Sequence, residues 1–154
     1  MKRESISLLL GYLDAQEDEI EKLYKEIESV EPVDKEKTVY LAYLLHNLYN
    51  AFEDLFREIA KTFENRVEDP NFSHKELLKR MIIEVPGVRP KVLSKESFLV
   101  LDELRGFRHV FRHAYTYELF PEKVEALRNR LVKSWGSIKK DLNEFKGWLS
   151  LNLN

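Results

Sequence analysis

Apolar side chains recur every three or four residues along most of the chain, which is the spacing of one face of an α-helix. The first such segment runs from near the N-terminus to Glu31-Pro32, and its stripe is Ile6, Leu9, Leu13, Ile20, Leu23 and Ile27. The second should begin near Asp34 and run to about Asn65, before the break at Asp69-Pro70. Its stripe is Leu41, Leu44, Leu48, Phe52, Leu55, Ile59 and Phe63.

The middle of the chain predicts a short helix followed by an ordered connector. Ser73-x-x-Glu76 is a capping-box signature, which predicts a helix to about Ile83. Pro86-Gly87 and Pro90 then favour a connecting turn.

Two further long helices complete the pattern. Ser94 is a suitable N-cap for a fourth helix, whose apolar residues are Leu99, Leu104, Phe107 and Phe111. Pro121 suits the first turn of a fifth, where its missing N–H costs nothing. That helix has the most regular stripe: Val124, Leu127, Leu131, Trp135, Ile138, Leu142, Phe145 and Leu149. With no strand-like alternation, we predict an all-α, antiparallel bundle of four long helices and one short helix, forming one domain over residues 1–154.

Composition is typical of a globular protein, because 44% of the 154 residues are hydrophobic and 34% are charged. The 25 Lys and Arg are outnumbered by 27 Asp and Glu, for a net charge of -2. Proteins that clamp long nucleic acids usually carry a basic excess. Any nucleic-acid chemistry must therefore come from a local basic patch.

The sequence lacks the features of several protein classes. There is no cysteine, which excludes disulfides and thiolate metal sites. The charged, amphipathic start does not resemble a signal peptide, and no run of about 18 apolar residues could span a membrane. We therefore expect a soluble cytoplasmic protein without a membrane partner.

One stretch, residues 105–115, holds three arginines and two histidines but no acid. Arginine presents a planar fork of donors to phosphate oxygens, and histidine exchanges a proton near neutral pH. Such a pair can cleave a phosphodiester without a metal: the imidazole assists attack of the ribose 2′-hydroxyl, while arginine stabilises charge on the phosphoryl oxygens. The same residues would equally complement the negative end of the helix dipole, with Phe107, Val110 and Phe111 simply in the core.

Helical geometry restricts how Arg108 and His113 can meet. Residues five apart on a straight helix point about 140° away from each other. Either the helix distorts before Tyr115, or a second copy of the chain brings Arg from one protomer toward His of the other across a symmetric cleft.

His109 and His113 also have the spacing of a helical metal pair, but no third ligand is evident nearby. We expect neither a metal nor a cofactor.

One face of the second helix is polar and could line the same cleft and orient a catalytic histidine. It consists of His46, Asn50 and Glu53, with Asn47 and Asp54 beside it. The alternative is a solvated or hydrogen-bonded surface. Glu53 also lies four residues before Arg57, where an ordinary helix ion pair would form.

The motif Arg108-x4-His113-x-Tyr115 resembles the Arg-x4-His-x-Tyr motif of HepT toxins, which belong to the HEPN superfamily of helical ribonucleases. An ordered series of further segments resembles the same family, together covering roughly residues 35–130. These segments are residues 44–49 with Glu53 and 59–60, then 73–78, 85–90, 101–109 and 117–124.

The resemblance implies the toxin of a bacterial or archaeal toxin–antitoxin pair, acting as a homodimer that cleaves RNA without metal. By that match Arg108 would contact phosphate and His113 would act as general base or acid. Arg105, His109, Arg112, Asn47 and Glu53 would bind RNA or support the site. The partner would be a nucleotidyltransferase antitoxin that transfers AMP onto Tyr115, the motif tyrosine.

Two other functions remain open from the sequence. The bundle could be a non-catalytic nucleotide- or substrate-binding partner of a nucleotidyltransferase, with the Arg/His patch holding a phosphate. It could also be a structural adaptor in which the basic patch is incidental. Toxicity of the chain expressed alone would favour the nuclease over both.

Overall fold

Five helices follow one another through the residues that the computed structural model describes, 3–64, 74–113 and 118–153. They are α1 (Arg3–Ser29), α2 (Lys35–Glu64), α3 (His74–Arg80), α4 (Lys95–Arg112) and α5 (Pro121–Leu151). Within these residues there is no strand, only an isolated bridge between Val85 and Arg89. The predicted all-α bundle of four long helices and one short helix is confirmed.

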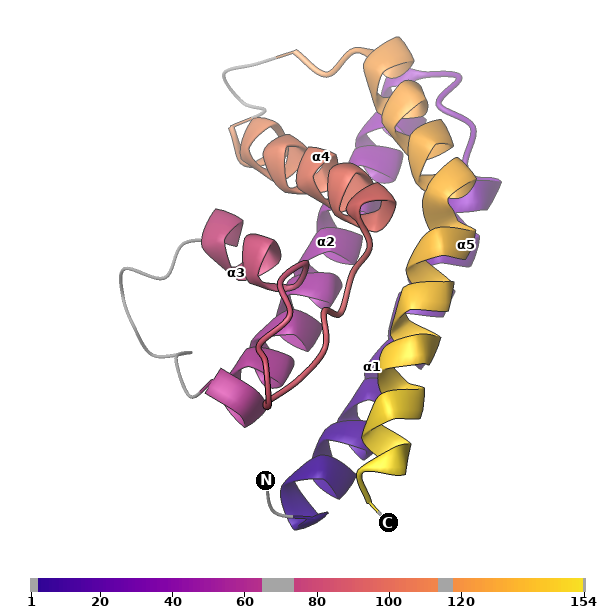
Figure 1. Ribbon diagram of the computed structural model, residues 1–154. Helices are drawn as coiled ribbons and strands as arrows, with labels where there is room; N and C mark the ends of the chain where they lie inside the picture. The colour runs from indigo at the N-terminus through magenta and orange to yellow at the C-terminus, as the bar shows by residue number, and fades with distance from the viewer. Residues whose placement is uncertain (1–2, 65–73, 114–117, 154) are drawn as a thin grey trace.

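α1 and α5 lie side by side and run in opposite directions (Figure 1). Two lysines of α5 show the register: Lys139 Nζ lies 3.0 Å from Glu21 Oε2, and Lys146 Nζ lies 2.8 Å from Glu17 Oε2. At the far end of α1, Arg128 Nη1 donates to the carbonyls of Ile27 and Val30 at 3.0 and 2.7 Å. A buried guanidinium from α5 thus satisfies backbone acceptors at the C-terminus of α1, where a cation is favourable.

α4 lies across α2 and is attached to α5 at its N-terminal end (Figure 1). Ser94 caps the helix, as predicted, by accepting a hydrogen bond from the Ser97 amide. Asp141 Oδ2 accepts bonds from the Ser94 amide, the Ser94 hydroxyl and the Ser97 hydroxyl at 2.8, 2.8 and 2.5 Å. This network fixes where α4 starts, and therefore where its C-terminal end lies over α2.

Most residues of the predicted stripes are buried in the core, and Leu23, Phe63, Phe107 and Phe111 are half-buried against it. All eight stripe residues of α5 are buried, and Trp135 stacks on Tyr24 of α1 with ring centroids 3.9 Å apart. The assignment of Leu99 to the α4 stripe is wrong, because its side chain is 53% exposed. Val100, Leu101 and Leu104 are buried instead, so the inward face of α4 is rotated by one residue at this end.

α3 ends at Arg80, three residues before the predicted Ile83. Ser73, the predicted cap, lies outside the described residues. The connector then makes a tight turn in which Gly87 has a φ of 77° and the Val88 amide donates to the Val85 carbonyl at 2.9 Å. Proline followed by glycine at a positive φ is the arrangement of a type II turn.

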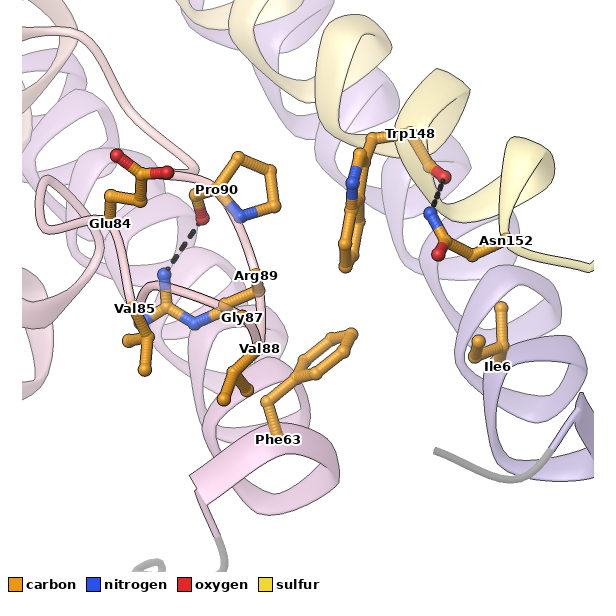
Figure 2. A pocket seen from close by; sticks show the side chains of 10 residues that line it. All are labelled: Ile6, Phe63, Glu84, Val85, Gly87, Val88, Arg89, Pro90, Trp148 and Asn152. Carbon is orange, nitrogen blue, oxygen red and sulfur yellow. Dashed lines mark hydrogen bonds between the residues drawn. The ribbon is translucent and has the colours of Figure 1, made fainter.

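The turn is anchored by Arg89, whose side chain is fully buried. Its guanidinium donates to Glu64 Oε1 at 2.7 Å and to the carbonyls of Arg80, Ile83 and Pro90. A cleft of about 480 Å³ lies between this turn, Trp148 of α5 and Asn152, the residue after that helix (Figure 2). No helix in the described residues is long and apolar enough to cross a membrane.

Candidate active site

The basic stretch lies at the C-terminal end of α4. The helix ends at Arg112, and His113 is its C-cap with φ −110° and ψ 23°. The His113 amide still donates to the Val110 carbonyl at 3.2 Å. The backbone of the motif histidine therefore departs from regular helical geometry, and its position depends on where α4 ends.

Arg108 and His113 line one surface hollow of about 190 Å³, together with Arg105, His109 and Arg112. On a helical projection the other three residues fall between Arg108 and His113, at about 40°, 60° and 100° around the axis from Arg108. The five side chains thus fill a continuous arc. Within a single chain the arginine and the histidine of the motif therefore line the same hollow.

Glu53 of α2 holds Arg108 in position. Arg108 Nη1 donates to Glu53 Oε2 at 3.0 Å, and Arg57 Nη2 donates to Glu53 Oε1 at 3.0 Å. The Glu53 side chain is 7% exposed, whereas the Arg108 side chain is 20% exposed. The ordinary helix pair of Glu53 with Arg57 forms as predicted, and the same carboxylate also fixes the orientation of Arg108.

The three arginines of the hollow differ in how their charge is compensated. Arg105 Nε donates to Asp102 Oδ1 at 2.9 Å, within the same helix. Arg112 is exposed and makes no ion pair with any residue that the structure describes. The hollow therefore has one guanidinium held by a buried carboxylate of α2, one paired within its own helix and one that is exposed.

His46 of α2 packs beneath the end of α4. Its ring lies 5.1 Å from the Phe111 ring centroid, and its Nε2 lies 3.2 Å from Asn50 Nδ2, an amide donor. Burial, followed by the charges of Arg108 and Arg112, lowers the pKa of His46 below its ordinary value. A neutral imidazole is expected here, accepting from Asn50 and supporting Phe111.

The two histidines at the helix end lie close together, with ring centroids of His109 and His113 4.5 Å apart. Within the described part of the chain, no group of three or more His, Cys, Asp or Glu side chains is arranged to hold a metal ion.

Two of the predicted site residues, Asn47 and Glu53, do not line the hollow, although Glu53 is hydrogen-bonded to Arg108, which does. Asn47 is half-buried on α2 and is absent from the residues that line the hollow. It lies about 120° around the helix from Glu53. Tyr115 falls outside the described residues. The motif does not include Asp102, although its position three residues before Arg105 is an ordinary signal for a helix ion pair.

Comparison with known proteins identifies the family of this chain. A family model described as HepT-like protein matches residues 40–149. Neither the curated proteins nor the solved structures contain a match. The matched region contains α3 and α4, most of α2 and α5, and every residue of the hollow. The chain belongs to the HepT-like family of the HEPN superfamily.

Proposed function

We propose that this protein is a cytoplasmic toxin that cleaves RNA at the hollow on α4 without a metal ion. The observation that carries the proposal is the composition of the hollow: its lining is three arginines and two histidines. Guanidinium groups match phosphate oxygens in charge and in geometry. A hollow with this lining is suited to one phosphate group of a nucleic acid.

The proposed reaction is transfer of the RNA phosphate to the neighbouring ribose. His113 takes the proton of the 2′-hydroxyl as O2′ attacks phosphorus, and the bond from phosphorus to the 5′-oxygen breaks. The leaving 5′-oxygen takes up a proton, leaving a 2′,3′-cyclic phosphate on one product and a 5′-hydroxyl on the other. His109, 4.5 Å from His113 between ring centroids, is the neighbouring group suited to supply that proton.

Arg108 is the proposed phosphate-binding residue. Its hydrogen bond to Glu53 orients the guanidinium before substrate arrives, so less conformational freedom is lost on binding. Arg112 supplies a second positive charge, and Arg105 extends the patch along α4. Asn47 is the weakest of the proposed supporting residues, because it lies away from the hollow.

The regulatory part of the proposal follows from the family. We propose a homodimer, a nucleotidyltransferase antitoxin as partner, and transfer of AMP to Tyr115, two residues after His113. A bulky anionic group at that position would block phosphate access to the hollow by charge and by size.

The test is cleavage of a labelled RNA pool by purified protein in EDTA, compared with His113→Ala and Arg108→Ala. The proposal predicts cleavage with cyclic phosphate ends by the parent protein and loss of cleavage in both variants, with unchanged helical circular dichroism. Arg130→Ala, an exposed arginine of α5 outside the hollow, is the matched control. Cleavage that survives the changes at Arg108 and His113 would refute the site, and binding without scission would favour the non-catalytic nucleotide-binding partner.

A further inference from the structure

An apolar groove of about 390 Å³ adjoins the basic hollow at the end of α4. Its lining includes Phe107 and Val110 of α4 and Val124 of α5, with Leu119 and Phe120 from the segment between the helices. His109 lines the groove and also lines the basic hollow. The two depressions therefore share a side chain and are neighbours on the surface.

The groove exposes aromatic and aliphatic surface. Phe120 is 46% exposed and Val110 is 39% exposed. Lys123 Nζ lies over the Phe120 ring, 5.2 Å from its centroid, so a positive charge faces the aromatic ring. The remaining polar group at its margin is Glu118, whose carboxylate can accept a hydrogen bond from a base amino group.

Resting on the proposed function, we infer that this groove binds a nucleobase next to the phosphate held in the hollow. A phosphodiester carries a nucleoside on each side, so a strand held by Arg108 and Arg112 must place an unpaired base close to His109. Single-stranded nucleic acids bind where a cationic track lies beside aromatic side chains, because every base has a face that stacks. Here the arginines of the hollow lie next to the groove that Phe107 and Phe120 line.

Phe120 is the residue that should carry base binding. It precedes Pro121 at the N-cap position of α5 and makes no side-chain cap bond, so capping does not explain its choice. Removing a stacking ring weakens single-strand binding by roughly 5- to 150-fold per base. Because Phe120 is only half-buried, the lower end of that range, about 5- to 10-fold, is expected.

The experiment uses single-stranded DNA, which lacks the 2′-hydroxyl and so cannot undergo the proposed cleavage. A fluorescent oligodeoxyadenylate and an abasic oligomer of equal length and charge are titrated with the whole protein at one salt concentration. We expect the base-containing strand to bind about 5- to 10-fold more tightly. Phe120→Ala should remove that difference and leave abasic binding unchanged, and Phe120→Tyr should restore it.

Leu99→Ala is the matched control, because Leu99 is an exposed apolar residue of α4 that lines neither depression. Equal binding of both strands, still dependent on Arg108 and Arg112, would overturn the base site and leave the phosphate site intact. A change in solution mass for Phe120→Ala, without loss of base preference, would instead assign the groove to contact between copies of the chain. Failure of both strands to bind, together with no RNA cleavage, would refute the proposed function itself.

Discussion

Arg108 Nη1 lies 3.0 Å from Glu53 Oε2, which joins the motif arginine of α4 to a buried carboxylate of α2, 55 residues earlier. The contact is long-range in the sequence and depends on how α4 crosses α2. The packing of α4 against α2 therefore sets the orientation of Arg108, the residue proposed to bind phosphate.

We predict that Glu53→Gln destabilises the fold, because two guanidinium groups lose the charge that compensates them. The expected loss is about 1–3 kcal/mol in the free energy of unfolding, measured by urea denaturation. Glu103→Gln is the control: its pair with Arg130 is exposed, and its loss should cost under about 1 kcal/mol. Equal losses in the two variants would mean that the buried contact contributes no more than a surface pair.

The guanidinium of Arg128 is predicted to stabilise the junction of α1 and α5. Arg128→Met removes hydrogen bonds to the carbonyls of Ile27 and Val30, and should cost about 2–4 kcal/mol in thermal or urea unfolding. Arg130→Met, two residues along the same helix and half-exposed, should cost under about 1 kcal/mol. Arg128→Met with wild-type stability would contradict a capping role for this side chain.

The stability of the protein should depend on His46 in mildly acidic solution. The folded-state pKa of His46 is lowered, chiefly by burial and also by Arg108 and Arg112. Between the folded pKa and the unfolded value of about 6.5, the unfolded chain binds more protons, so stability rises with pH there. Below the folded pKa this contribution is lost, and above the unfolded pKa it is fully present.

The measurement is the free energy of unfolding from pH 4.5 to 7.5 for the parent, His46→Gln and Asn50→Ala. His46→Gln should flatten the acid side of the profile, whereas Asn50→Ala, which removes no titrating group, should keep a positive slope. A profile for His46→Gln that parallels the parent would assign the acid loss to other groups.

Two glycines should respond to alanine with opposite signs. Gly87 has a φ of 77°, and a Cβ there meets nothing within 4 Å, so backbone strain alone should cost about 1–2 kcal/mol. Gly136 lies inside α5, also with open space around a Cβ, and Gly136→Ala should stabilise by about 0.5–1 kcal/mol. The pair is compared by urea unfolding, and a stable Gly87→Ala would show that the turn relaxes to a negative φ.

The sequence by itself determined most of the helices and the composition of the basic stretch. The three- and four-residue spacing identified the buried stripes of α2 and α5, because one face of a helix must leave water. Ser94 and Pro121 marked helix starts through local backbone chemistry that acts over one turn. The basic stretch likewise pointed to phosphate, since arginine and histidine keep their properties wherever the fold places them.

Only the tertiary structure decided which of these residues meet. Leu99 has the spacing of a core residue but is exposed, because contact with α2 and α5 selects the adjacent face of α4. The end of α4 at Arg112 places His113 on the same hollow as Arg108, although helical spacing alone separates them. The pair of Arg108 with Glu53, and the groove beside His109, arise from the packing of segments distant in the sequence. Local periodicity carries no information about such contacts, because they are fixed by how whole helices pack.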